Sequence, residues 1–287
     1  MTSPPYGKLR DYNGYTFDHT AIINTLYRVT KPGGVVVWVV ADETNDGSES
    51  GASFRQALHF KEQGFLLHDT MIYFKNTSSF PARRGGNRYT QIFEYMFVFS
   101  KDTKPKTAVL ICDKRNRWAG SVNWGQKTHR GREGILIPTK DIKPVPAFSP
   151  RNNAWHYTVG GGFGQEDKAA YKHPATFPFR LPIDHINTWS NPGDVVLDPM
   201  AGSGTTCIAA QSLGRNYIGV DISSEYCGLA RLRLENASKE SYEKQLYAEE
   251  LKVQERDKRR DEILQRLTAQ EREILGFPAL TPFHGLN

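Results

Sequence analysis

Cysteine is scarce in this sequence, and long apolar runs are missing from it. Its 287 residues include three cysteines, Cys112, Cys207 and Cys227, which are too few and too scattered for a disulfide framework or a Cys-x-x-Cys metal site. No apolar run approaches the roughly 20 residues that cross a bilayer, and the first residues lack the basic and apolar regions of a signal peptide. These features argue against a disulfide-stabilised secreted domain and a membrane protein, and they predict a cytoplasmic protein.

Positive charge is concentrated in one part of the chain. The whole sequence carries a formal net charge of +6, from 37 Lys and Arg against 31 Asp and Glu. Residues 101–151 alone hold twelve Lys and Arg against four Asp and Glu, an excess larger than that of the whole chain. A localised cationic stretch can neutralise the phosphates of a nucleic acid. Charge alone leaves a solvated surface segment as an equal alternative.

Apolar periodicity predicts an α/β fold. The pattern gives helices at 19–30, 53–63, 179–189 and 205–213 and strands at 35–40, 65–74, 91–99, 195–197 and 217–220. It also gives a last helix, continuous or with a break, from Ser223 or Ser224 to about Leu275. The strand at 35–40 is a continuous β-branched run, which is typical of strands buried on both faces of a largely parallel sheet. Between about 101 and 171 the periodicity fades. We therefore expect a doubly wound, mostly parallel Rossmann-like sheet with a small basic insert.

A glycine-rich turn follows the strand at 195–197 and precedes a helix. In the segment Asp198-Pro-Met-Ala-Gly-Ser-Gly-Thr-Thr206 the glycines allow a tight turn and close approach to a ligand, and the helix N-terminus favours an anionic group. Thr205 stands where a phosphate-binding P-loop needs lysine, and Cys207 stands where the dinucleotide fingerprint needs glycine. Asp221, at the end of the next strand, is placed to accept hydrogen bonds from ribose hydroxyls. A plain strand-to-helix turn is the alternative.

A Pro-Pro loop stands at the start of the sequence. Thr2-Ser3-Pro4-Pro5-Tyr6 could be any proline turn, but its groups suit one chemistry. An exocyclic base amine is a poor nucleophile because its lone pair is delocalised into the ring. The Ser3 side chain and the Pro4 carbonyl can accept the two N–H bonds of such an amine and localise that lone pair. Tyr6 supplies an aromatic face for a base swung out of a duplex.

In their order along the chain, these segments resemble the motifs of the amino-group DNA methyltransferases of the β arrangement. In that family an Asp/Ser-Pro-Pro-Tyr motif comes first, a target-recognition region follows, and the methyl-donor loop comes last. Residues 3–6 match the first motif, 172–178 resemble the short motif before the cofactor strand, and 198–206 and 217–221 match the donor-binding segments. The resemblance implies S-adenosyl-L-methionine as the cofactor and double-stranded DNA as the substrate.

The resemblance covers residues 1 to about 235 and implies roles for individual residues, none of them metal ligands. The resemblance assigns catalysis and target-base binding to Ser3, Pro4, Pro5 and Tyr6. Donor binding falls to His173, Pro174, Ala175, Thr176, Asp198, Pro199, Gly202, Ser203, Gly204, Thr205, Thr206 and Asp221. DNA contacts fall to Arg83, Arg84, Arg88, Lys114, Arg115, Arg117, Lys127, Arg130 and Arg132. Serine at the first motif position favours N4 of cytosine over N6 of adenine as the methylated atom.

The start of the sequence departs from the family's pattern. The family has a strand directly before the Pro-Pro loop and a Gly-Asp-type segment earlier still, whereas only Met1 and Thr2 precede Ser3 here. A truncated DNA-binding fragment without activity is therefore one alternative, beside an N6-adenine DNA methyltransferase and an RNA or protein methyltransferase. Asp42, at the end of a predicted strand, is interpreted as an ordinary loop acid more readily than as a functional one.

The chain divides into four predicted parts. Residues 1–100 form the catalytic half of the methyltransferase domain, 101–170 the basic target-recognition insert, 171–238 the donor-binding half, and 239–287 a charged helical extension. The extension mixes acidic and basic residues in near balance, which predicts an exposed or self-associating helix with i,i+4 ion pairs. A homodimer and a cognate restriction endonuclease are further candidate partners, neither of which the sequence establishes.

Overall fold

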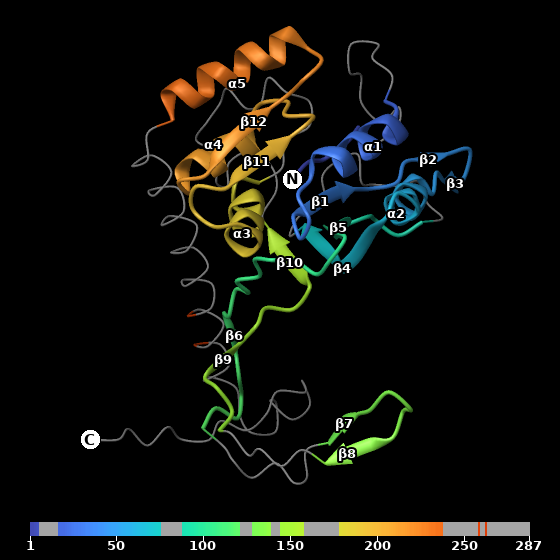
Figure 1. Ribbon diagram of the computed structural model, residues 1–287, viewed down its shortest axis with the longest axis vertical. Coiled ribbons are helices and arrows are strands. Elements are labelled where there is room, and N and C mark those ends of the chain that lie inside the picture. Colours follow the sequence, from blue (N-terminus) through green and yellow to red (C-terminus); the bar gives the residue numbers. More distant parts are fainter. Residues whose placement is uncertain are drawn as a thin grey trace. The chain divides into compact units, whose positions relative to one another are not determined.

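The computed structural model describes residues 1–5, 17–75, 88–120, 128–138, 144–157 and 178–237, together with Lys258 and Glu262. The chain divides into two compact units, Met1–Asn236 and Ala237–Asn287, and Figure 1 labels the elements of the first. In the second unit Lys258 and Glu262 are helical. The rest of the predicted helical extension lies outside the described residues.

The described helices are α1 (His19–Val29), α2 (Ala52–Glu62), α3 (Arg180–Trp189), α4 (Thr205–Ser212) and α5 (Ser224–Asn236). The first four lie close to where the apolar period predicts them. The predicted last helix begins where expected but is interrupted, because α5 ends at Asn236 and Ala237 is not helical. A local signal accounts for the start of α1. The Asp18 carboxylate accepts hydrogen bonds from the backbone N–H groups of Thr20 and Ala21 at the start of α1, as an N-cap residue does.

The strands predicted from the apolar pattern all form. The described strands are β1 (Val35–Val40), β2 (Thr44–Asn45), β3 (Ser48–Glu49), β4 (Phe65–Lys75), β5 (Phe93–Lys101), β6 (Lys114–Arg115), β7 (Thr128–Arg130), β8 (Leu136–Pro138), β9 (Phe148–Ser149), β10 (Ala154–Tyr157), β11 (Val195–Asp198) and β12 (Asn216–Gly219). The sequence did not predict β10, because four residues are too few for an alternation of apolar and polar positions to stand out.

The central sheet has the strand order β1, β5, β4, β10. β5 is antiparallel to β1 and to β4, whereas β10 is parallel to β4, so that β1, β4 and β10 share one direction. β11 and β12 form a parallel pair. The predicted mostly parallel sheet is therefore confirmed, with β5 as its antiparallel member among the described strands.

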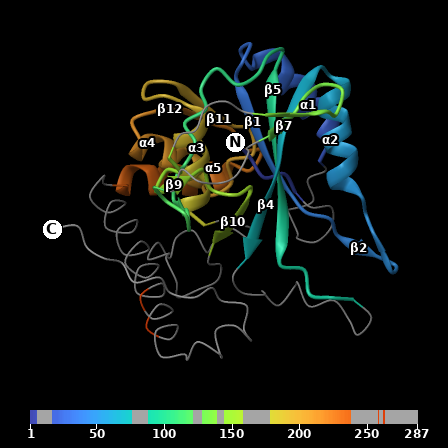
Figure 2. The ribbon, with the colours of Figure 1, turned by 90° about the horizontal axis from the view of Figure 1, so that it is seen from below.

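Apolar clusters cover both faces of the central sheet. Trp38 and Val40 of β1 pack against α1 and α2 on one face, and Val37 and Val39 pack with Leu181 of α3 on the other. Figure 2 shows α1 and α2 on one side of β1, β5 and β4, and α3 on the other. Because both faces of β1 are buried, its side chains form one continuous apolar run in the sequence. The doubly wound architecture is confirmed.

Met1 and Thr2 lie between the central sheet and β11. The Thr2 N–H donates to the Val37 carbonyl at 3.0 Å, and the Thr2 carbonyl accepts from the Val39 N–H at 3.0 Å, which makes a parallel bridge to β1. On the other side the Met1 amine donates to the Leu197 carbonyl of β11 at 3.0 Å. These two residues therefore join the two sheets beside the last residue of β11.

A pair of antiparallel segments leaves the central sheet after β5 and returns to it before β10. β6 and β9 pair within it, and backbone hydrogen bonds of 2.8 Å from N to O join the two segments at both ends. We call residues 111–120 and 145–151 the stalk. β7 and β8 form a separate hairpin between its two segments in the sequence.

Candidate active site

The glycine-rich turn connects the end of β11 to the start of α4. Gly202 and Gly204 have φ angles of 51° and 80°, which glycine adopts without strain. A Cβ atom on Gly204 would lie 2.8 Å from the Cβ of Ala230 in α5. The turn opens onto the N-terminus of α4, where the first backbone N–H groups have no partner within the helix and favour an anionic ligand atom.

Asp221 lies beyond the end of β12 and is joined to this turn. Its Oδ2 accepts a hydrogen bond from the Gly202 N–H at 2.7 Å, and its Oδ1 accepts one from the Ser223 N–H at 2.9 Å. Each carboxylate oxygen can accept a second hydrogen bond. Asp221 therefore fixes the shape of the turn and keeps acceptor capacity for hydroxyl groups of a ligand.

The Pro-Pro loop begins next to the same turn. Thr2, which is 1% exposed, donates a hydrogen bond from its Oγ1 to Oδ1 of Asp198 at 2.7 Å. Ser3 follows Thr2 directly, so the structure brings the start of the predicted catalytic loop to the start of the predicted cofactor loop. Ser3 and Pro5 are half-buried and Pro4 is buried. Tyr6 lies outside the described residues, as do His173, Pro174, Ala175 and Thr176.

Asp198 is a buried acid with a structural task. Burial raises the pKa of its carboxyl group above the ordinary value, while hydrogen bonds from Thr2 and from the Met200 N–H favour the charged form. Nearby, burial raises the pKa of the Cys207 thiol to about 12, so that Cys207 remains a neutral thiol and is a poor nucleophile. Cys207 is therefore not suited to attack on a base.

Arg233 of α5 contacts the glycine-rich turn, and it was not among the residues predicted from the sequence. It is 7% exposed, and its Nη1 donates to the Ser203 carbonyl and to Oγ1 of Thr205, the latter at 3.3 Å. Arginine is rarely buried without partners. The sequence did contain a hint of this role, because Arg233 stands among apolar positions of a predicted helix. Its partner Ser203 lies 30 residues away along the chain, so the sequence did not show what Arg233 contacts.

The basic residues predicted to contact DNA fall into separate groups. Lys114, Arg115 and Arg117 are on the stalk, and the first two are exposed in β6. The Arg117 guanidinium lies 4.8 Å from the ring centroid of Trp118, which is half exposed. Arg130 and Arg132 are exposed on the β7–β8 hairpin. Arg83, Arg84 and Lys127 lie outside the described residues.

Two polar residues near the strand ends have structural partners. Asp42 is buried, and its carboxylate accepts hydrogen bonds from the Ser50 hydroxyl at 2.9 Å and the Ser53 N–H at 3.1 Å, at the start of α2. This agrees with its interpretation as a loop acid. Arg88, predicted to contact DNA, donates to the Gly47 carbonyl in the β2–β3 hairpin. At least part of its guanidinium is therefore engaged within the chain.

The part of the chain that the structure describes contains no group of three or more His, Cys, Asp or Glu side chains arranged to hold a metal ion. Likewise, none of its helices has the length and apolar character that crossing a membrane requires.

Comparison with known proteins places the chain in a family. The N6/N4 DNA methylase family matches residues 1–232. The orphan methyltransferase M.BamHII of Bacillus amyloliquefaciens is 51% identical over 236 residues, which are 82% of this chain and 88% of that protein. The DNA adenine methyltransferase YhdJ of Escherichia coli is 42% identical over 185 residues, covering 62% of this chain and 56% of YhdJ.

Solved structures share the fold. The Thermus thermophilus protein TTHA0409, a putative DNA modification methylase in complex with S-adenosyl-L-methionine, aligns with a TM-score of 0.52 at 22% identity, over 82% of this chain and 84% of that one. The chain belongs to the N6/N4 DNA methylase family. It is a DNA methyltransferase of the amino-group type, the family uses S-adenosyl-L-methionine as methyl donor, and the family resemblance drawn from the sequence is confirmed.

Proposed function

We propose that this protein transfers a methyl group from S-adenosyl-L-methionine to the exocyclic amine of a base flipped out of double-stranded DNA, with N4 of cytosine as the preferred atom. One observation carries the proposal. The 2.7 Å hydrogen bond from Thr2 to Asp198 holds the start of the Ser-Pro-Pro loop against the start of the glycine-rich loop. A nucleophile oriented by the first loop and a methyl donor held by the second would therefore meet.

The residues around the glycine-rich loop fit this donor. When bound, S-adenosyl-L-methionine supplies an electrophilic methyl group on a sulfonium centre. Asp221 offers acceptor oxygens to ribose hydroxyls, and the N-terminus of α4 offers N–H groups to a carboxylate. The hydroxyl groups of Ser203 and Thr205 lie in buried residues at the same turn. Arg233 holds this turn in shape, which is an indirect contribution to binding.

Ser3 and Pro4 would act on the amine. The Ser3 hydroxyl and the Pro4 carbonyl would accept hydrogen bonds from its two N–H groups, which draws the lone pair out of the ring and points it at the methyl group. The nitrogen that gains the methyl group would then lose one of its two protons to water. This hydrogen bonding matters more in the transition state than in the ground state, so it raises the rate rather than the affinity. Holding both reactants in a near-attack geometry removes much of the entropic cost of their meeting. Tyr6 would stack on the extruded base.

The stalk and the β7–β8 hairpin would bind the DNA backbone. Their exposed cations, Lys114, Arg115, Arg117, Arg130 and Arg132, are of the type that neutralises phosphates. With DNA as the substrate, the site of action would be the cytoplasm of a bacterium, an archaeon or a phage-infected cell. A homodimer and a cognate restriction endonuclease stay predictions, which sedimentation of the purified protein and inspection of the neighbouring genes would test.

N6 of adenine is the second candidate target. Ser3 at the first motif position favours cytosine, whereas YhdJ, which is 42% identical over 185 residues, is named as an adenine methyltransferase. Both amines present two N–H bonds to the same pair of acceptors, so the loop chemistry serves either base. The choice would depend on the shape of the pocket that receives the base.

Sequencing of DNA from cells that express the protein tests the proposal. The gene is expressed in a host that lacks its own DNA methyltransferases, and long-read sequencing identifies the methylated base and its sequence context. We expect N4-methylcytosine at one recognition sequence, and none when Ser3→Ala is expressed at the same level. N6-methyladenine instead would select the second candidate. No methylation, together with no calorimetric binding of S-adenosyl-L-methionine, would contradict the proposal and favour a DNA-binding fragment.

A further inference from the structure

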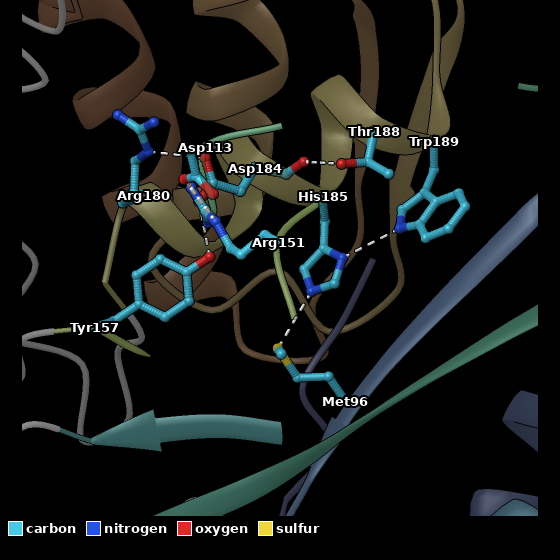
Figure 3. A network of polar contacts seen from close by, with 9 residues as sticks. All are labelled: Met96, Asp113, Arg151, Tyr157, Arg180, Asp184, His185, Thr188 and Trp189. Atoms are coloured by element: carbon cyan, nitrogen blue, oxygen red, sulfur yellow. Dashed lines mark hydrogen bonds and ion pairs between the residues drawn. The ribbon is translucent and has the colours of Figure 1, made fainter. Parts of the chain in front are cut away.

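A buried carboxylate on α3 collects three donors from different parts of the chain. Asp184 is 2% exposed. Its Oδ2 accepts hydrogen bonds from Nη1 of Arg151 at 2.8 Å and from the Tyr157 hydroxyl at 2.9 Å, and its Oδ1 accepts one from Nε of Arg180 at 2.8 Å. Figure 3 shows these side chains converging on Asp184. A buried charge with this many partners is held in one position.

Arg151 connects this carboxylate to the base of the stalk. While its Nη1 contacts Asp184, its Nε donates to Oδ2 of Asp113 at 2.9 Å, and its Nη2 pairs with the same oxygen. Asp113 is on the outgoing segment of the stalk, and Arg151 ends the returning one. The Arg151 N–H also donates to the Ile111 carbonyl at 2.8 Å. One guanidinium therefore ties both segments of the stalk to α3.

The charges in this cluster balance. Arg151 and Arg180 face Asp184 and Asp113, two cations against two anions. The planar guanidinium presents donors along two edges, so that it can serve two carboxylates at once, which a lysine ammonium on a flexible stem does less well. The Arg151 guanidinium also lies 5.3 Å from the ring centroid of Trp155 in β10, which restricts it further. These contacts join the base of the stalk to α3 and to β10.

A rigid attachment matters because the stalk carries cations away from its base. Lys114 and Arg115 lie directly after Asp113, and Arg117 follows near the far end. A small rotation at the base produces a larger displacement along the stalk. Cations displaced in this way would no longer meet the phosphates that they neutralise, and each lost phosphate contact weakens binding of DNA.

We propose that Arg151, Asp113 and Asp184 are positioning residues for target recognition, which clamp the base of the stalk to α3 and so set where the insert meets DNA. The proposal rests on the proposed function in taking DNA as the ligand of the insert. The geometric part, that the clamp fixes the stalk, does not depend on activity. The two parts are therefore tested separately.

Distance measurement tests the geometric part. Spin labels are placed at Lys61 of α2 and Arg115 of the stalk, both exposed, through a keto amino acid, so that the native cysteines stay. Pulsed electron resonance then gives the distribution of distances in the free protein. We expect a narrow distribution in the otherwise unchanged chain and a broader or shifted one with Arg151→Met. An unchanged distribution would overturn the clamp, whatever the enzyme's activity.

Kinetics tests the recognition part on the full chain. Once wild-type methylation has identified the recognition sequence, Arg151→Met should raise the KM for DNA about tenfold or more, because displaced cations lose phosphate contacts. Discrimination against a site with one changed base pair should fall, while affinity for S-adenosyl-L-methionine and the single-turnover rate at saturating DNA stay within about twofold. Asp113→Asn should show a smaller effect of the same kind, and Arg151→Lys should restore part of the loss.

Gln56→Met is the matched control. Gln56 of α2 is 5% exposed and its Oε1 accepts a hydrogen bond from Nε1 of Trp38 at 2.8 Å, on the face of the central sheet opposite α3. This variant should lose thermal stability as Arg151→Met does but keep the KM and the discrimination. If the two variants change KM and discrimination equally, Arg151 merely stabilises the fold and the proposal fails. Absence of methylation by the wild-type protein would refute the proposed function instead.

Discussion

His185 gives a prediction that can be worked out from its surroundings. It is 1% exposed on α3, its Nδ1 accepts a hydrogen bond from Nε1 of Trp189 at 3.2 Å, and its Nε2 faces the sulfur of Met96 at 3.2 Å. Figure 3 shows the ring between these two side chains. Burial lowers the pKa of His185 to about 3, from 6.5 for the free side chain. The folded protein therefore holds this imidazole neutral.

The lowered pKa makes stability depend on pH. Between pH 6.5 and about 3 the unfolded chain binds a proton at His185 that the folded chain does not, so stability falls as the pH falls through this window and is fully present above it. One proton corresponds to about 1.4 kcal/mol per pH unit. Acidification from pH 7.5 to 5.0 should therefore remove about 2 kcal/mol of the free energy of unfolding through this residue alone.

Urea unfolding at the two pH values measures the effect. His185→Asn cannot titrate, and its side-chain oxygen can still accept from Trp189. We expect the variant to be less stable at pH 7.5, because a buried ring is lost. Its deficit relative to the wild type should shrink by about 2 kcal/mol at pH 5.0. Equal losses of stability in both proteins on acidification would refute the reasoning and mean that His185 is reached by water in the folded state.

Three further predictions concern the proposed activity. Asp221→Ala should weaken binding of S-adenosyl-L-methionine in calorimetry by roughly 1.5–3 kcal/mol, the range for hydrogen bonds to a charged group; unchanged affinity would mean that another acid binds the ribose. Ser3→Ala should lower the single-turnover methylation rate with little change in DNA affinity, since only the transition state needs the lone pair localised, and an unaffected rate would remove Ser3 from catalysis. Replacing Arg115 or Arg117 by Gln should reduce the slope of DNA affinity against salt concentration by about 1 if that residue contacts a phosphate; slopes unchanged in both variants would place the DNA elsewhere.

Local signals made most of the first unit predictable. Each of these signals determines the structure of the residues next to it in the chain. Examples are the β-branched run of β1, the glycines at 202 and 204, and the acid at 221. The order of these signals then implied which strand tips meet. The hydrogen bond between Thr2 and Asp198, which are 196 residues apart, joins two of these strand tips.

Polar contacts between residues far apart in the chain could not be predicted from the sequence. Asp184 and Arg151 are 33 residues apart, and Arg233 and Ser203 are 30 apart. No periodicity in the sequence links such pairs, because each contact depends on how distant segments pack together in the folded protein. β10 was not predicted for a related reason. Its place depends on pairing with β4 across the sheet, and four residues are too few to show this pairing in the sequence.

The position of α3 has a consequence for the coupling between the binding of DNA and the binding of the methyl donor. α3 holds the base of the stalk through Asp184 and packs against α4, whose first turn follows the glycine-rich loop. If docking of DNA shifts α3, the shift reaches α4. Thermodynamic linkage then requires that DNA and donor alter each other's affinity by the same factor. Titrating one in the presence of the other would measure that factor. A value of 1 would mean that DNA and donor bind independently, and any other value would mean that the two sites are coupled.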